Sequence, residues 1–507
     1  MTTRALTAAA SHASPTRGRA ARSSARRGAA ERFPREAAVA IAGLALFAAP
    51  LPFLLRFDST HAVTATLLSV LLCGLTLASR RTGIIATTVF LAALGDYRRY
   101  AGSFEGYPES DPLLMVAPVA ALFLLGCAIL EGRARASTGL SKLVLALMAL
   151  MFFEIFNPLQ GGLQVGFAGA LFYLVPLVWF WIGRAYPTAD FMRRFTLRVV
   201  LPIGVIATLW GLWQTRYGLL AFERQWVTAI GYGALYISDD VIRAIGFFNS
   251  SAEYQRYLLV TAVILIAGAL RERVTWALLL PVVAATIFLS AARSPVIVLV
   301  GTAVALWAIK SRASLAWFPR AALGAALGLG LLIMSLAFLR TVPFGDRLAP
   351  VVTRQVEGLL DPANQQKSTA TGHLLMIREG ILAGVTSPAG QGLGAATIAA
   401  SKYGARTTNA EFDIANITLS LGILGGLLYL AIVVAVFRKA LGWWRAERSF
   451  VALATIGVLL VSFGAWLVGG EYSTAALVWI YIGAMDKLSV EQRIERIRSR
   501  ARSADHA

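Results

Sequence analysis

Arginines at the edges of apolar runs are the residues of this sequence best suited to chemistry. Arg243 opens the segment Arg243–Asn249, and Arg293 follows Ser290 and two alanines, with apolar residues on both sides. A guanidinium group is charged at neutral pH, and its fork of N–H donors matches phosphate oxygens. An arginine at the boundary of an apolar stretch costs free energy unless it is paired or solvated. We weigh a phosphate ligand and a side chain that extends to a membrane surface equally for Arg293.

Carboxylates in front of a long apolar run are the candidates for a general base. Glu411 and Asp413 stand in the segment Asn409–Asn416, where a helix is expected to begin. Free amides and the helix dipole favour carboxylates at such a position, so helix capping is the simpler interpretation. Beside a cluster of arginines, the same carboxylate would accept a proton from a hydroxyl group. Glu154, near the predicted outer end of another apolar run, is a second candidate.

Polar residues and glycines near these positions complete the candidate site. The segment Pro388–Gly394 contains three glycines, which let backbone amides approach a phosphate, although an ordinary loop is the more common meaning of such a run. The residues that we predict to bind substrate are Asn249, Arg256, His373, Arg378, Gly392 and Asn416.

Metal chemistry has little support in the sequence. Cys73 and Cys127 lie inside apolar runs, where a free cysteine behaves as a small hydrophobic residue. Two such residues exclude a disulfide framework and a thiolate metal cluster. Two of the four histidines lie in the terminal tails, and His61 and His373 are far apart in sequence. We therefore predict neither a metal site nor a cofactor.

The composition excludes a soluble globular protein. Of 507 residues, 57% are hydrophobic, a further 45 are glycines, and only 15% are charged. Soluble domains contain about 45–50% apolar residues when glycine is included. The 47 basic residues outnumber the 27 acidic ones, giving a net charge of +20. Because the basic residues are scattered between apolar runs, they indicate the cytoplasmic loops of a membrane protein rather than a nucleic-acid partner.

The apolar runs predict an all-α fold, a polytopic transmembrane helical bundle with about 14 (12–14) spans. The predicted spans are 37–56, 62–79, 82–95, 112–131, 138–157, 162–183, 197–215, 256–270, 274–290, 294–309, 320–339, 414–437, 449–468 and 472–486. A cytoplasmic N-terminus puts most lysines and arginines on the cytoplasmic side, as the positive-inside rule requires. An even number of spans then places both termini there.

Three segments follow from this arrangement. Residues 1–36 form a basic tail, predicted to be disordered and cytoplasmic, because no short apolar region with a cleavage site follows its arginine pair. Residues 37–486 form the transmembrane domain, and its long loops 216–255 and 340–413 both face outward. Residues 487–507 form a second basic cytoplasmic tail, for which an amphipathic helix on an anionic membrane and a solvated tail are equally consistent. Chemistry must therefore occur in the membrane or in the two long loops.

In this layout, the sequence resembles the O-antigen ligase and polymerase superfamily of bacterial polysaccharide assembly. The resemblance covers about residues 240–430 and depends on the order and spacing of four degenerate motifs. These are the arginine–glycine–phenylalanine segment Arg243–Asn249, the serine–arginine segment Ser290–Ser294, the proline–glycine segment Pro388–Gly394 and the helix Glu411–Gly426 with its glycines Gly422, Gly425 and Gly426.

The resemblance implies a metal-independent glycosyltransferase of the bacterial inner membrane. Its donor would be a glycan on undecaprenyl pyrophosphate, with Arg243 and Arg293 holding the pyrophosphate and Glu411, or Asp413, acting as base. Ligases of the family typically have a histidine where this sequence has Glu411, so a carboxylate there favours the polymerase branch. Many members have an arginine near the position of His373, and Arg378 is the candidate to replace it.

We therefore expect a polymerase of lipid-linked oligosaccharide repeats, active at the periplasmic face. Its partners would be the undecaprenyl-pyrophosphate-linked oligosaccharide, membrane lipids and other polysaccharide-assembly proteins, but not nucleic acid. The nearest alternative is an O-antigen ligase that transfers finished glycan to lipid A-core or another acceptor. A transporter or flippase of the same lipid-linked glycan is a further alternative, although inverted repeats and carboxylates deep in a span are not evident. The last alternative is a structural subunit of a synthesis complex.

Overall fold

Helices account for almost all regular structure in the described part of this protein. The computed structural model describes residues 60–108, 110–238, 240–311, 334–335, 338–339, 341–361, 370–397, 400, 412–467 and 471–505. The predicted N-terminal tail, the predicted span 37–56, most of the predicted span 320–339 and the candidate base Glu411 lie outside these residues.

The first half of the described chain forms α3 (Thr60–Ala78), α4 (Arg80–Glu105), the 3-10 turn η1 (Pro112–Met115), α5 (Val116–Leu130), α6 (Gly139–Glu154), η2 (Pro158–Gln160), α7 (Leu163–Ala185), α8 (Ala189–Phe195), the π-helical turn η3 (Thr196–Val200) and α9 (Leu201–Tyr217). A short polar segment follows, with α10 (Ala221–Ala229), η4 (Gly233–Leu235) and the antiparallel strands β1 (Tyr236–Ser238) and β2 (Val241–Ile242). Tyr236 pairs with Ile242, and Ser238 pairs with Val241.

The second half forms α11 (Ser251–Arg271), η5 (Val274–Leu279), α12 (Leu280–Leu289), α13 (Arg293–Lys310), α15 (Leu348–Leu360), α16 (Ala370–Thr386), α18 (Asp413–Glu447), α19 (Phe450–Val461) and α20 (Tyr472–Asp505). Several helices begin at a serine or threonine whose hydroxyl accepts a backbone N–H of the first turn, which satisfies a donor that the helix itself leaves free. These N-caps are Ser79, Thr138, Thr188, Ser250 and Ser449.

Apolar helices are the dominant feature of this bundle. In the described residues, seven helical segments are long and apolar enough to cross a membrane. They are Thr60–Ala78, Pro112–Leu130, Leu163–Ala185, Ala189–Tyr217, Ser251–Arg271, Arg293–Lys310 and Asp413–Glu447. Each predicted apolar run that falls in the described ranges coincides with a helix, and Val274–Leu289 and Phe450–Val461 are shorter apolar helices. The helical prediction is therefore confirmed, whereas the number of spans stays a prediction.

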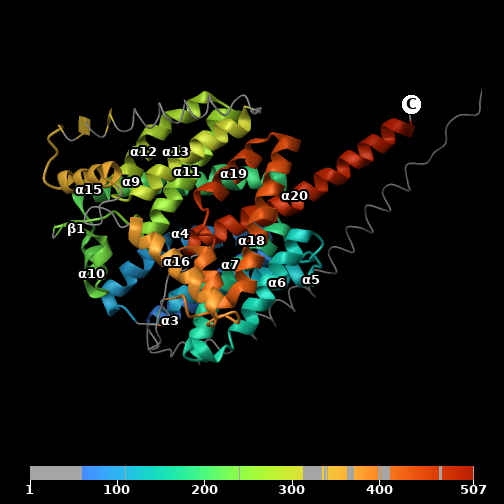
Figure 1. Cartoon of the computed structure of the whole chain (residues 1–507), viewed down its shortest axis with the longest axis horizontal. Helices are drawn as coiled ribbons and strands as arrows, with labels where there is room; N and C mark the ends of the chain where they lie inside the picture. Colours follow the sequence, from blue (N-terminus) through green and yellow to red (C-terminus); the bar gives the residue numbers. More distant parts are fainter. Residues whose placement is uncertain are drawn as a thin grey trace, which may run out of the picture. The chain divides into compact units, whose positions relative to one another are not determined.

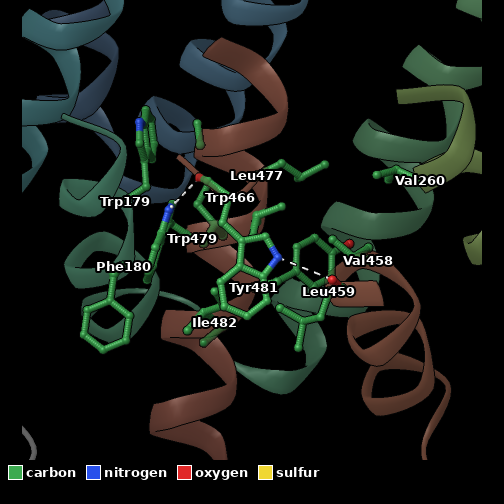
Figure 2. Packing of buried hydrophobic residues seen from close by; sticks show 14 of the residues in the cluster. Trp179, Phe180, Val260, Val458, Leu459, Trp466, Leu477, Trp479, Tyr481 and Ile482 are labelled. Carbon is green, nitrogen blue, oxygen red and sulfur yellow. Dashed lines mark hydrogen bonds between the residues drawn. The ribbon is translucent and has the colours of Figure 1, made fainter. Parts of the chain in front are cut away.

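Aromatic side chains fill the centre of the bundle. Figure 2 shows Trp466 and Trp479 beside Phe180 and Tyr481, and all four are buried. The indole N–H of Trp479 donates to the carbonyl of Trp466 at 3.0 Å, and that of Trp466 donates to Leu459 at 3.3 Å. A buried indole N–H without an acceptor costs free energy, so these two bonds stabilise the core and favour one orientation of each ring.

The two ends of the bundle carry different polar groups, and we name them for the chain segments that they hold. The loop end holds the polar segment 218–250 and α15, and Figure 1 shows α10, β1 and α15 on one side of the bundle. Four helices begin at the loop end. Ser473 of α20 donates to Glu253 of α11, Asp413 of α18 lies near Arg256, and Arg293 of α13 lies against α15. The tail end lies at the other ends of these helices, where α20 continues towards Asp505. At the tail end, the buried carboxylate of Asp486 forms ion pairs with Arg184 and Lys439 and accepts the Thr138 hydroxyl at 2.8 Å.

The C-terminal segment 487–505 is helical, as a direct continuation of α20. Its side chains are mostly exposed from Glu491 onward, and Arg496 donates to the carbonyl of Ala446 near the end of α18 at 2.5 Å. No glycine or proline interrupts the helix after Gly483. Its position on a membrane surface or in solvent stays a prediction.

A break in α18 holds the segment that follows α16. Gly422, with φ +69° and ψ −172°, interrupts the helical backbone, so the preceding carbonyls lose their helical partners. The amides of Gln391 and Gly392 donate to the carbonyls of Leu419 and Ser420, at 3.0 and 3.1 Å. The chain after α16 thus inserts beside the interior of a long apolar helix and completes its hydrogen bonding.

Candidate functional site

Three arginines from separate elements gather at the loop end, and we call Arg243, Arg293 and Arg354 the arginine cluster. Arg243 directly follows β2, Arg293 is the first residue of α13, and Arg354 lies in the middle of α15. Arg293 and Arg354 are both close enough to act electrostatically on Arg243. Two of the three are the arginines that the sequence singles out, from segments 50 residues apart, and the fold brings them to one place.

The start of α13 and the side of α15 position Arg293. The preceding turn is tight, because Ala291 adopts φ +55°, a conformation that a residue with a side chain rarely takes. The side-chain amide of Gln355 donates to the carbonyl of Ala292 at 2.8 Å and so ties this turn to α15. Arg293 then crosses α15 at Gly358, where a β-carbon would overlap its guanidinium group. A glycine at this position is therefore a condition for the placement of Arg293.

Backbone hydrogen bonds on both sides position Arg243. Its own N–H donates to the carbonyl of Leu235 at 2.8 Å, and the amides of Ile245 and Gly246 donate to the Gln214 side chain at 3.1 and 2.8 Å. The Arg243 Nε is buried and has no hydrogen-bond partner among the described residues. A buried guanidinium donor without an acceptor costs free energy, so this atom favours an added anionic ligand.

The electrostatics of the cluster point to the same conclusion. Burial, together with the positive charges of Arg354 and Arg293, lowers the pKa of Arg243 from its ordinary value to about 10. Like charges at one site repel each other, and the repulsion is strongest where water is excluded. A multiply charged anion would reverse these terms, because it would attract all three guanidinium groups and accept their N–H donors.

Arg354 is the residue of this cluster that the sequence interpretation missed as a ligand. Its Nη1 lies 3.5 Å from the carbonyl of Tyr236, which connects α15 to β1. Figure 1 places α15 and β1 on the same side of the bundle, where they are in contact. A signal was present in the sequence, since Arg354 and Gly358 are four residues apart and therefore share one face of a helix.

Asp413 occupies a closed position at the start of α18. Its side chain is fully buried, and its carboxylate accepts the Tyr429 hydroxyl at 2.6 Å and the backbone N–H groups of Trp466 and Leu467 at 2.5 and 3.1 Å. Each oxygen therefore has a donor, and this geometry fits the anchoring of a loop better than proton transfer to a substrate. Glu411, the preferred base, lies outside the described residues.

Arg256 and Asn249 make contacts within the protein. Arg256 pairs through two nitrogens with the buried carboxylate of Glu471, one at 2.9 Å. The side-chain oxygen of Asn249 accepts from Arg98 at 3.2 Å, and its side-chain nitrogen donates to the carboxylate of Glu253 at 3.3 Å. Both residues thus lie at the loop end, but their polar groups are already engaged, and ligand binding would need an exchange of partners.

Gly392 and Glu154 lie where α6, α7 and α18 meet the segment that follows α16. The amide of Gly392 already donates to Ser420, so it is not the free phosphate-binding amide that the sequence suggested. Its conformation, with φ +96°, instead allows close contact with the side chain of Gln160. The carboxylate of Glu154 accepts from the side-chain amide of Asn157 at 2.7 Å, and its carbonyl accepts from Leu393 at 3.2 Å.

Three remaining candidates lie on α16 and α18. Asn416 is buried in the first turn of α18. His373 is half-buried and Arg378 is exposed on α16, a helix that packs along α18. The arginine cluster is built on α13, α15 and the segment after β2, so none of these three residues shares an element with it.

A cavity adjoins the same helix that carries Arg354, and apolar side chains as well as polar groups line it. Its volume is about 500 Å³, and its lining residues are Leu339, Val342, Phe344, Ala349, Val352, Thr353, Val356 and Glu357. On a helix of 3.6 residues per turn, Val352 and Val356 lie on roughly the opposite face from Arg354 and Gly358. Helix α15 therefore separates a cationic site on one face from this cavity on the other.

No protein-family model matches this chain, and no curated protein matches it either. The family and the activity are thus open to inference from the residues and their geometry.

Proposed function

We propose that this protein is a membrane glycosyltransferase that polymerises oligosaccharide repeats linked to undecaprenyl pyrophosphate. The arginine cluster is the observation that carries the proposal. A diphosphate linking a sugar to a lipid is a dianion, and bond cleavage leaves still more charge on it. Fixed guanidinium groups stabilise that developing charge without reorganisation, which is a large source of catalytic rate.

The distribution of charge along the helices supports a position in a bacterial inner membrane, with the loop end at the periplasmic face. The tail end carries the basic segments that the positive-inside rule assigns to the cytoplasm. There, Arg80 and Glu131 pair at 2.8 Å, and Arg193 and Glu272 pair at 2.8 Å. In this proposal, fourteen spans place both termini in the cytoplasm, and the lipid-linked donor binds at the outer surface of the membrane.

The reaction in this proposal replaces one bond to an anomeric carbon with another. A hydroxyl oxygen of the acceptor glycan attacks that carbon, the carbon–oxygen bond to the diphosphate breaks, and the electron pair leaves with the diphosphate. Arg243, Arg293 and Arg354 bind the leaving group. A carboxylate takes the hydroxyl proton, and Glu411 stays our prediction for this base. The side chains of Leu339, Val342 and Val352, which line part of the cavity beside α15, suit the first isoprene units of the carrier lipid.

Reconstitution in vesicles tests the proposal directly. The purified protein, supplied only with lipid-linked repeats, should produce a ladder of longer glycans. Arg243→Ala and Arg293→Ala should lower the rate by about 100–1,000-fold, at unchanged protein level. Arg224→Ala removes an exposed arginine of α10 and is the matched control, with an expected rate near that of the unmodified protein. Ladders of normal length from both cluster variants would contradict the proposal.

The same assay separates the alternatives. A ligase would produce no ladder until a second acceptor, such as lipid A-core, is added. A transporter of the lipid-linked glycan is the other candidate, and the break in α18 favours it, since interrupted helices often line transport sites. It would move the donor between leaflets without lengthening the glycan. A metal chelator should leave polymerisation unchanged, and inhibition by EDTA that added metal reverses would contradict the metal-independent reaction.

A further inference from the structure

Two buried side chains outside the arginine cluster hold the loop that follows Arg243. The guanidinium group of Arg99, at the end of α4, donates to the carbonyl of Phe248 at 2.6 Å and to that of Gly246 at 2.9 Å. The amide of Asp96, in the same helix, donates to the carbonyl of Phe247 at 3.0 Å. Three consecutive carbonyls of this loop are therefore bound by one end of α4.

Gln214, near the end of α9, binds the same loop from another direction. Its Oε1 accepts the N–H groups of Ile245 and Gly246 at 3.1 and 2.8 Å, and its Nε2 donates to the carbonyl of Gly246 at 3.2 Å. The Nε2 also donates to a carboxylate oxygen of Glu223 at 2.6 Å. Because both oxygens of Glu223 accept, one from Gln214 and one from the Leu220 N–H, the carboxylate fixes which side of the Gln214 amide faces the loop.

Burial makes this arrangement rigid. Arg99 and Gln214 are each 1% exposed, and Glu223 is fully buried. The other oxygen of Glu223 accepts the N–H of Leu220 at 2.7 Å, and the Arg99 guanidinium lies over the ring of Trp226 at 5.5 Å. Apart from the Nε of Arg99, which has no hydrogen-bond partner among the described residues, the polar atoms of these three side chains are bonded, so the network permits few alternative positions of the loop.

We propose that Gln214 and Arg99 are positioning residues, which act by fixing the loop so that Arg243 lies in the arginine cluster. This inference rests on the proposed function. The bonds from Gln214 begin two residues after Arg243, and the N–H of Arg243 itself is held by Leu235. The position of Arg243 in the arginine cluster therefore depends on the ends of α4 and α9, although neither helix contributes a residue to the cluster. Misplacement of a binding group by about 1 Å costs about 100-fold in rate.

An exchange of side chains tests the role of the Gln214 amide. Gln214→Met removes the donor and the acceptor at similar length and should lower kcat by about 100-fold. Gln214→Glu alone should be equally impaired, because two carboxylates then face each other. The double variant Gln214→Glu with Glu223→Gln should recover at least a tenth of the wild-type kcat. In the double variant, the carboxylate at position 214 accepts the N–H groups of Ile245 and Gly246, and the amide at position 223 donates to that carboxylate. Gln225→Met, exposed on α10, is the matched control.

Binding of inorganic pyrophosphate to the purified full chain separates this inference from the proposed function. If the wild type does not bind pyrophosphate through Arg243, the proposed function fails and this inference with it. If the wild type binds and polymerises, but Gln214→Met matches it in kcat and binding, only the positioning role is wrong. A loss of activity in Gln214→Met that follows the loss of folded protein, with no recovery in the exchanged pair, would also contradict the positioning role. Recovery in the exchanged pair supports it.

Discussion

Arg243 illustrates how a functional residue can oppose the stability of its own fold. It is half-buried, its Nε has no acceptor among the described residues, and two like charges act on it. Its pKa lies below the ordinary value in the folded protein, so folding weakens the binding of its proton. The charged form therefore costs free energy of folding at pH 7, and this cost disappears only as the pH rises above about 10.

Replacing this charge with an apolar side chain should stabilise the protein while abolishing its activity. Arg243→Met should raise the free energy of unfolding at pH 7 by roughly 1–3 kcal/mol, because one unit of pKa shift corresponds to about 1.4 kcal/mol. Thermal unfolding in detergent measures this change, and Arg224→Met is the control at an exposed site. A lower melting temperature in Arg243→Met than in the control would show that the cluster is structural.

The buried carboxylate of Glu223 makes the stability of the fold depend on pH in the opposite direction to Arg243. Burial raises its pKa from 4.5 to about 7, against the opposing effect of Arg99. Between these values the folded state binds more protons than the unfolded state, so stability falls as the pH rises from about 4.5 to about 7. In Glu223→Gln the part of this slope that comes from Glu223 should disappear. Melting temperatures of both proteins from pH 4.5 to 8 measure it, and parallel curves would contradict the assignment to Glu223.

At the scale of elements, α15 joins the cluster to the rest of the loop end. One face of this helix carries Arg354 and accommodates Arg293 at Gly358, and the other faces the cavity. Gln355 ties the helix to the turn before α13. The proposed headgroup site and the proposed lipid site are thus on opposite faces of one element of four turns, and they should respond together when that element is displaced.

A single β-carbon on α15 should therefore disable the site. In Gly358→Ala, the added methyl group overlaps the Arg293 guanidinium, which must leave its place. We expect polymerisation to fall by about 100-fold with the chain still folded. Gly301→Ala is the matched control, because it lies within α13 and its β-carbon meets no neighbouring atom within 4 Å. If both variants retain wild-type rates, Arg293 does not act from the position that the structure gives it.

The sequence predicts some features of the site well and others poorly, and the reason is physical. Apolar runs set the helices, and an arginine between two such runs marks Arg293 without tertiary information. The partners of a buried carboxylate depend on distant contacts instead. Asp413 looked like a base because nothing in its own segment shows that Trp466 and Leu467 supply its donors. Arg99 and Gln214 were missed for the same reason, since their partners are backbone groups.

At the scale of the whole molecule, the charges of the two ends predict the orientation in the membrane. Single cysteines placed at Arg224 and Arg498 are both in exposed positions, at the loop end and in the extension of α20. An impermeant maleimide added to intact cells should label the first and not the second, and lysis should expose both. Cys73 and Cys127 are buried and serve as the unlabelled background. The reverse pattern would place the arginine cluster on the cytoplasmic side and end the proposal.

The interrupted helix α18 has a consequence for biosynthesis. A nascent span with a break would expose bare carbonyls of Leu419 and Ser420 to lipid, and each would cost free energy there. The amides that cover them belong to Gln391 and Gly392, which are translated earlier. When α18 leaves the translocon, its complement is therefore already synthesised and within reach. Because the segment with Gln391 and Gly392 precedes α18 in the chain, its amides can bind the free carbonyls of α18 as soon as this helix enters the membrane.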